Sequence, residues 1–148
     1  MSQELFQKKE DFRAFTLLEL LVVLMILGLL AALVGPRIIS RVGGAKQEVA
    51  KSQLALLETA LDQYRLDVGR YPTTEEGLEA LITPPQEEEV RRLWRGPYLK
   101  KRKIPKDPWG RPYHYRSPGE HGEYDLWSYG ADNQPGGEGE AADITSWD

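Results

Sequence analysis

The sequence predicts an α+β protein in which one long N-terminal helix, membrane-spanning at first and amphipathic later, packs on a small antiparallel sheet. Three observations predict this fold. An uncharged apolar run extends from Leu20 to Pro36, a helical apolar stripe follows Arg37, and short strand-like segments alternate with turns in the second half. With 148 residues, 41% of them hydrophobic, the chain can hold one modest core and one membrane span but not two full domains.

The N-terminal end has two parts. Residues 1–14 carry charges of both signs and lack an apolar core, so they do not have the pattern of an ordinary secretory signal. Residues 15–36 are just long enough to cross a bilayer of about 30 Å as a helix. At the end of this span, Pro36 removes a backbone donor and clashes with the preceding turn, which predicts a kink or a locally unwound stretch.

Glu19 is the one charged residue of this span. A carboxylate inside a bilayer costs about 2.5–3.5 kcal/mol on insertion scales, so such a group needs a partner and a role. Its own apolar segment offers none, and an amine is the expected partner. If the chain is cut between Ala14 and Phe15, Glu19 lies about one helical turn from the new α-amino group, and the amine of a neighbouring copy could neutralise it. The alternative is an ordinary signal anchor with a chance glutamate.

The helix is predicted to continue beyond the span, because apolar residues recur there at helical spacing and form one stripe. They are Ala50, Leu54, Leu57, Leu61, Tyr64 and Val68. Gly69 is the predicted stop of this helix. Thr73 and Glu76 then have the spacing of a capping box, which predicts a short second helix from Glu75 to Leu81.

Three short segments with strand character follow. They lie around Tyr98-Leu99, from Pro112 to Tyr115 and from Tyr124 to Ser128, and turn residues separate them. Segments of this length suit a small antiparallel sheet laid on the helical stripe.

Residues 91–111 are strongly basic, and Asp107 is the only acidic residue among them. Basic residues beside Trp and Tyr can bind nucleic acid. However, prolines punctuate the segment like a solvated loop system, and a membrane-anchored, exported domain would rarely meet nucleic acid. We therefore expect no nucleic-acid partner and favour a salt bridge to the acidic loop of a neighbouring subunit.

Catalysis is not signalled by any residue pattern. His114 and His121 are the only histidines and cysteine is absent, so no Ser/His/Asp or Cys/His set can be organised for nucleophilic catalysis. We expect that the protein is not an enzyme. Without cysteine, no disulfide stabilises the exported part of the chain.

The last segment, residues 129–148, combines carboxylates with glycines and contains no Lys or Arg. Hard oxygen ligands on a flexible backbone suit calcium, which accepts six to eight oxygens from carboxylates, carbonyls and water. A C-terminal metal-binding loop is one interpretation, and a merely solvated or disordered tail is the other. The acidic residues are Asp132, Glu138, Glu140, Asp143 and Asp148.

The N-terminal residues carry a resemblance to a known family. A polar leader, the small residue Ala14 and the run Phe15-Thr16-Leu17-Leu18-Glu19 before an apolar helix resemble the type IV pilin-like family. The resemblance implies that a prepilin peptidase removes residues 1–14 and methylates the new N-terminus at Phe15, and that Glu19 acts in assembly. Family members usually have Gly before the cut, so Ala14 is a departure.

Two further segments narrow the resemblance. Tyr71 to Leu81 and Asp107-Pro108-Trp109-Gly110 are similar to the corresponding parts of major pseudopilins of type II secretion. That resemblance implies a single-pass protein of the bacterial inner membrane, with a transmembrane and polymerisation helix at 15–36 and a periplasmic α+β head at 37–148. It further implies that the chain polymerises with itself into a periplasmic pseudopilus, which drives the export of folded proteins across the outer membrane.

The implied partners are the prepilin peptidase, the minor pseudopilins and the inner-membrane assembly platform of the secretion system. A type IV pilus subunit is the alternative within the superfamily, although many true pilins close their C-terminal loop with a disulfide that this chain cannot form. A membrane-anchored periplasmic hydrolase is the alternative from another class.

The same resemblance implies calcium as the cofactor of the C-terminal loop. Asp132, which follows a Gly-x pair, and Asp143 match the family's acidic ligands, whereas Ala142 stands where a second, adjacent Asp is usual. Glu140 or Glu138 could supply the missing carboxylate. The backbone carbonyls of Tyr129 and Gln134 would complete the shell.

Overall fold

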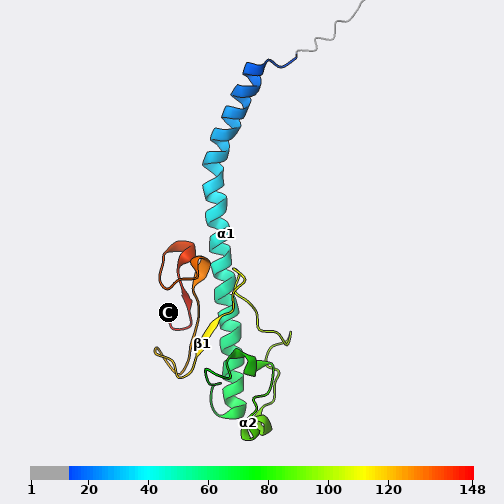
Figure 1. The fold of residues 1–148 in the computed structure, drawn as a ribbon, viewed down its shortest axis with the longest axis vertical. Coiled ribbons are helices and arrows are strands. Elements are labelled where there is room, and N and C mark those ends of the chain that lie inside the picture. Colours follow the sequence, from blue (N-terminus) through cyan, green and yellow to red (C-terminus); the bar gives the residue numbers. More distant parts are fainter. Residues whose placement is uncertain (1–13) are drawn as a thin grey trace, which may run out of the picture. The chain divides into compact units, whose positions relative to one another are not determined.

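The computed structural model describes residues 14–148, apart from the side chains of residues 36–40. The chain forms two compact units, one ending at Ile38 and one comprising Ile39–Asp148. Figure 1 shows the order of the elements, which are α1 (Leu17–Val68), η1 (Leu78–Leu81), α2 (Glu88–Leu93), β1 (His114–Arg116), β2 (Asp125–Ser128), η2 (Gly130–Asp132), η3 (Gly139–Ala141) and β3 (Ile144–Thr145).

The first unit is the apolar part of α1. Leu17–Gly35 is long and apolar enough to cross a membrane, and none of it is buried within the chain. This confirms the predicted long apolar helix. The helix is continuous through Pro36, so no unwound stretch interrupts it, while a kink at this residue stays a prediction. Of the predicted leader, residues 1–13 lie outside the described residues.

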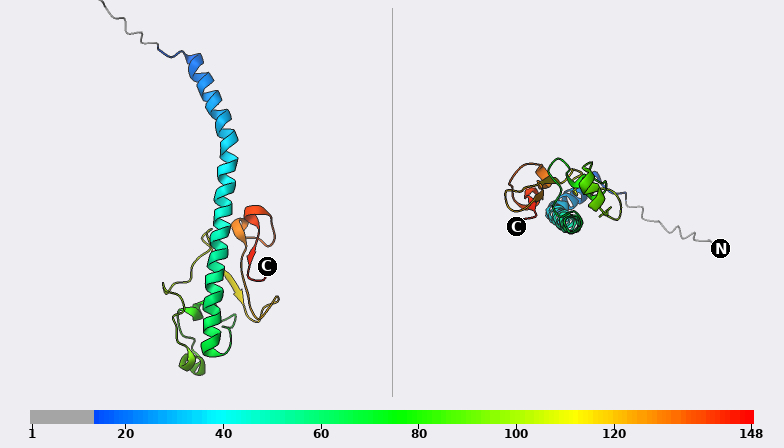
Figure 2. Two further views of the ribbon diagram at one scale, coloured as in Figure 1. Left: turned by 180° about the vertical axis from the view of Figure 1, so that it is seen from behind. Right: turned by 90° about the horizontal axis from the view of Figure 1, so that it is seen from below.

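The second unit is built on the remainder of α1. The predicted stripe is buried from Ala50 to Tyr64, and Val68 packs at its edge. Leu81, Tyr113, Leu126 and Ile144 cover the stripe from η1, the sheet and its neighbouring loop. The helix ends at Val68, one residue before the predicted stop. In Figure 1 and in the left view of Figure 2, the C-terminal loop lies beside the part of α1 that belongs to the second unit, and α2 lies near the C-terminal end of α1.

The sheet is antiparallel, with strand order β1-β2-β3. Tyr115 pairs with Leu126, and Ser128 pairs with Ile144. The two segments predicted at 112–115 and 124–128 therefore correspond to β1 and β2, with shifted ends. The third predicted strand, at Tyr98-Leu99, is wrong.

The physical reason for this error is a competing hydrogen bond. The Tyr98 N–H donates to the Leu81 carbonyl at 2.8 Å, so this extended segment is fixed against η1 instead of the sheet. The sheet takes its third strand from Ile144–Thr145, which has two residues and is too short to show an alternating pattern.

The predicted helix from Glu75 to Leu81 is only partly correct. The capping box itself is present: the Glu76 N–H donates to Thr73 Oγ1 at 3.2 Å, and the Thr73 N–H donates to the Glu76 carboxylate at 3.2 Å. It closes a turn, however, because Gly77 adopts a φ of +62°, which is incompatible with a continuing right-handed helix. The helical part starts afterwards, as the 3₁₀ helix η1.

Asp125 is the fully buried carboxylate of the sheet. Burial would raise its pKa, but the Glu120 N–H, the Arg116 guanidinium and His121 donate hydrogen bonds to it and lower the pKa to about 2. The ionised form is thus strongly preferred in the folded state.

We expect this carboxylate to make the second unit acid-sensitive. Because the folded pKa is lowered from 3.8 to about 2, its stabilising contribution is present above about pH 4 and is lost as the pH falls towards 2. The loss amounts to about 2 kcal/mol. Denaturant unfolding of the full-length chain in detergent, followed by Trp fluorescence, measures it. Asp125→Asn should be less stable at pH 7 but should show a flatter dependence between pH 4 and pH 2; an unchanged slope would contradict this assignment.

Candidate functional site

The N-terminal candidate site consists of residues 14–19, at the start of α1. Ala14, Phe15 and Thr16 precede the helix, so the predicted cleavage bond lies in non-helical backbone. Phe15 is 76% exposed. A peptidase needs an accessible bond outside a helix, and this segment offers one.

Glu19 has a partner within its own chain, contrary to the expectation from the sequence. The Thr16 N–H donates to Glu19 Oε2 at 3.3 Å, and the Glu19 N–H donates to Thr16 Oγ1 at 3.2 Å. These reciprocal bonds are a capping box that satisfies two backbone donors at the helix start. The Thr-x-x-Glu spacing that predicted the capping box at Thr73 would have identified this one too.

The capping box does not neutralise Glu19. It supplies two hydrogen bonds but no positive charge, so the cost of an ionised carboxylate beside apolar surroundings is only partly offset. The side chain is held at the first helical turn, close to Phe15, which would become N-terminal if the predicted cleavage occurs. Among the described residues its hydrogen bonds are those with Thr16, so a positively charged partner stays a prediction.

The second candidate site is the loop between β2 and β3. Its two short helices, η2 and η3, contact each other, and the strand pair closes its base. Asp132 Oδ1 accepts a hydrogen bond from the Gln134 N–H at 3.1 Å, and Asp143 Oδ2 accepts one from the Gly136 N–H at 2.9 Å. Both predicted aspartates are thus integrated into the loop backbone.

The second oxygen of Asp143 has the feature expected of a metal ligand. Oδ1 is buried and has no hydrogen-bond partner within the described residues. A buried carboxylate oxygen without a donor is costly unless something positive reaches it. This orphaned oxygen fits a hard cation.

The other predicted ligands are arranged less simply. Glu140 lies against α1, where its side chain fills the position that a Cβ on Gly43 would take. Glu138 and Gln134 are exposed, and the Tyr129 ring packs against the His114 ring in a tilted arrangement, with centroids 4.7 Å apart and an interplanar angle of 53°. Among residues 14–148, no three Asp, Glu, His or Cys side chains are grouped as metal ligands, so carbonyls or water would have to complete a shell.

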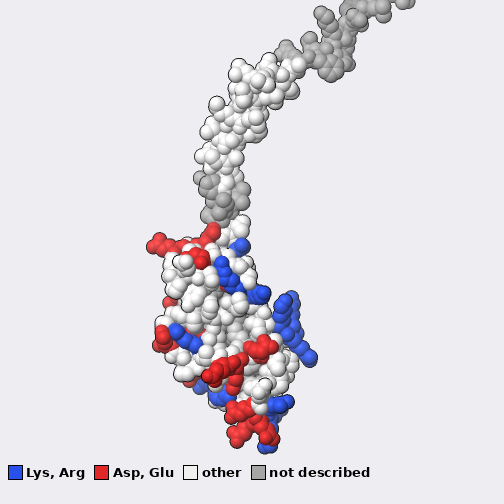
Figure 3. Space-filling view, viewed as in Figure 1, with Lys and Arg blue, Asp and Glu red and all other residues white. Residues whose placement is uncertain are grey.

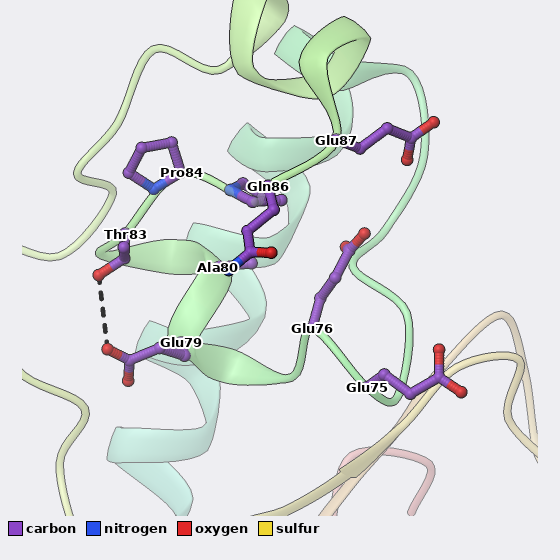
Figure 4. Close-up of a pocket in the computed structure, with 9 residues that line it drawn as sticks. Glu75, Glu76, Glu79, Ala80, Thr83, Pro84, Gln86 and Glu87 are labelled. Carbon is purple, nitrogen blue, oxygen red and sulfur yellow. Dashed lines mark hydrogen bonds between the residues drawn. The ribbon is translucent and has the colours of Figure 1, made fainter.

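An acidic hollow lies beside η1 and contains Glu75, Glu76, Glu79 and Glu87 (Figure 4). Arg70 pairs with Glu76 at 2.9 Å and with Glu87 at 3.2 Å. Its hydrogen bonds lower the pKa of Glu76 against the opposing effect of burial, and the Thr73 N–H adds to the lowering. Two of the four carboxylates, those of Glu76 and Glu87, are therefore paired with Arg70. This pairing indicates that the hollow is a structural ion-pair network.

The basic segment at 91–111 presents an exposed run from Lys100 to Lys103. Figure 3 shows basic side chains gathered along one flank of the second unit. Asp107, the only acidic residue of the segment, is 5% exposed and turned inward. The surface of this segment is accordingly more basic than its composition suggests.

Comparisons with known proteins agree with these features. The family model "Type II secretion system (T2SS), protein G" matches residues 37–147, and the model "Prokaryotic N-terminal methylation motif" matches residues 11–35. The type II secretion system core protein G of Vibrio cholerae is 49% identical over 141 residues, which cover 95% of each chain. Its counterpart in Pseudomonas aeruginosa is 49% identical over 135 residues, 90% of this chain and 94% of the relative.

A solved structure is similar as well. The crystal structure of the major pseudopilin from the type 2 secretion system of enterohaemorrhagic Escherichia coli is 38% identical and superposes with a TM-score of 0.61. The similarity covers 74% of this chain and 92% of that one. The part of the chain that this match covers therefore shares its fold with that protein.

Proposed function

The chain belongs to the type II secretion system protein G family and is a structural subunit of the pseudopilus; from this premise we propose how it is processed, assembled and stabilised. In this proposal the chain starts as a single-pass protein of the inner membrane with its head in the periplasm. It then polymerises with itself and drives folded proteins across the outer membrane. The observation that carries the proposal is Glu19, a carboxylate whose bonds among the described residues are to Thr16 alone, at the start of an exposed apolar helix.

The N-terminus is the proposed site of maturation. A prepilin peptidase would cut between Ala14 and Phe15 and methylate the new α-amino group. The match to the N-terminal methylation motif and the non-helical backbone at this bond support the proposal. The amine of one copy would then neutralise Glu19 of its neighbour as subunits enter the filament.

We expect cleavage to be detected directly. Co-expression with an active prepilin peptidase should yield membrane protein that begins at Phe15 and is N-methylated, as measured by intact mass spectrometry. Ala14→Gly, the residue usual in the family, should be cut at least as fast, whereas a bulky Ala14→Leu should block cleavage. An intact chain beginning at Met1 in the presence of active peptidase would contradict the assignment.

The C-terminal loop is the proposed calcium site, with Asp132 and Asp143 as ligands. The orphaned Asp143 Oδ1 and the oxygen-only chemistry of the loop support it. A bound calcium ion would close the C-terminal loop, as a disulfide does in many true pilins. Glu138, Glu140 and the carbonyls of Tyr129 and Gln134 remain candidates for the rest of the shell.

The proposed partners are further copies of the chain, the prepilin peptidase, the minor pseudopilins and the inner-membrane assembly platform. We propose no catalytic role, since the family is structural. The type IV pilus alternative is not favoured, because the family model matching residues 37–147 is that of secretion protein G. No observation favours a hydrolase.

A further inference from the structure

The turn Asp107-Pro108-Trp109-Gly110 lies outside both the N-terminal site and the proposed calcium ligands. The turn is organised around the buried carboxylate of Asp107. Asp107 Oδ1 accepts hydrogen bonds from the Trp109 N–H at 3.1 Å and the Arg111 N–H at 2.8 Å. The Asp107 N–H donates back to the Arg111 carbonyl at 2.8 Å, so the turn is closed on itself.

The second oxygen of Asp107 leads to the C-terminal loop. Ser128 Oγ donates to Asp107 Oδ2 at 2.8 Å and accepts the Gly130 N–H at 3.2 Å. Asp107 is 5% exposed and Ser128 is fully buried, so water competes little with these bonds. A serine hydroxyl thus relays the buried carboxylate to the start of the loop.

The Arg111 side chain donates hydrogen bonds to backbone carbonyls at the same place in the loop. Its Nη1 donates to the Gly130 carbonyl at 3.0 Å, and Nη1 and Nη2 reach the Ala131 carbonyl at 3.4 and 3.3 Å. Gly130 is consequently bonded through both its N–H and its C=O.

The position of Gly130 accommodates only glycine. Gly130 has a φ of +73°, and a Cβ there would meet the Ala142 carbonyl oxygen at 2.6 Å. The two ends of the loop therefore touch at this point. By contrast, residues 133–142 form hydrogen bonds mainly with partners in the loop itself. The exception is the Gly139 carbonyl, which accepts a hydrogen bond from Gln47 of α1. Most side chains of residues 133–142 are exposed.

We propose that Asp107, Ser128 and Arg111 form a clamp that fixes residues 128–132 without metal, and that the clamp positions Asp132 for the cation. Calcium then orders only residues 133–142. Asp107, Ser128 and Arg111 are positioning residues and bind no metal themselves. The calcium part of this inference rests on the proposed calcium site, whereas the metal-free clamp does not.

Hydrogen exchange of the full-length chain in detergent, followed by mass spectrometry, tests the clamp. In excess chelator the wild-type amides of residues 128–132 should exchange slowly and those of 133–142 quickly, and calcium should slow only the second group. If 128–132 exchanges as fast as 133–142 in chelator, the clamp does not exist. If calcium changes nothing while 128–132 stays protected, the calcium site fails and the clamp stands.

Variants test positioning separately from folding. Arg111→Met should speed exchange at 128–132 in chelator and weaken calcium binding about tenfold, as expected for losing a charge-assisted hydrogen bond. Arg111→Lys should restore part of the affinity. Ser128→Ala should act like Arg111→Met, and Arg91→Met, which removes the same charge from exposed α2, should change neither readout.

Protection of the α1 amides shows which variants remain folded. If Arg111→Met and Ser128→Ala keep wild-type calcium affinity and wild-type exchange at 128–132, the assignment of these residues is overturned. If a variant loses α1 protection as well, the wild-type exchange pattern in chelator decides for or against the clamp.

Discussion

Replacing Glu19 by alanine should leave the chain in the membrane but abolish filament assembly. The substitution removes a charge from an apolar span, so insertion should be unaffected or easier. It also removes the only group in Leu17–Gly35 that can pair with the amine of a neighbouring Phe15. Breaking a buried charge pair costs about 3 kcal/mol, which corresponds to about a hundredfold loss in subunit association.

The matched control separates the charge of Glu19 from its capping role. Glu19→Gln keeps a side-chain acceptor that can bond the Thr16 N–H, since Gln also serves in capping boxes, but it carries no charge. We expect this variant to assemble as poorly as Glu19→Ala. Thr16→Val should lose the capping bond to the Glu19 N–H and keep the charge, and it should assemble better than either. Normal filament yield from Glu19→Gln, measured by sedimentation and electron microscopy, would contradict charge pairing.

Removing calcium should destabilise the second unit strongly. A ligand that binds only the folded state stabilises it by about 2.7 kcal/mol at a hundredfold excess over its Kd. For a unit of this size that corresponds to a fall in Tm of roughly 10 °C in chelator. Scanning calorimetry of the full-length chain in detergent, with calcium and with chelator, measures the difference. Identical melting under both conditions would exclude the site.

Four substitutions resolve the ligands. Asp132→Ala and Asp143→Ala should each abolish the calcium-dependent shift in Tm. Asp148→Ala is the matched control, because Asp148 is an exposed carboxylate bonded to Thr145 at the chain end, and it should keep the shift. Since Glu140 lies against Gly43, we expect Glu140→Ala to keep most of it. A lost shift in Glu140→Ala would show that this side chain turns into the loop and replaces the carboxylate missing at Ala142.

The long helix was predictable because its signals are periodic and extend over many residues. The stripe from Ala50 to Tyr64 is buried as its spacing predicts, and the helix ends beside Gly69. The strand Ile144–Thr145 was not predictable, because two residues cannot show alternation. Tyr98-Leu99 has strand-like residues, but its backbone is bonded to η1, a choice that only tertiary structure determines.

The candidate site was predictable in part for the same reason. Glu19 was recognisable because it is a lone charge in an apolar run, and in the structure it lies in the first turn of α1. The bonds from Arg111 to Gly130 and from Ser128 to Asp107 connect residues 19 and 21 positions apart in sequence, so no local pattern predicts them. The burial of Asp107 was not predictable from the sequence either. An acidic residue in a basic segment is expected to lie at the surface and pair with a neighbouring cation, whereas Asp107 is buried.

The most direct test of the central claim is electron microscopy of filaments from cells that overexpress this chain together with a prepilin peptidase. A pseudopilus subunit should form thin homopolymeric filaments whose subunits begin at Phe15, with fewer or shorter filaments when chelator is present during assembly. The absence of filaments from wild-type chain, correctly cleaved and present in the membrane, would contradict the claim that it is a structural subunit.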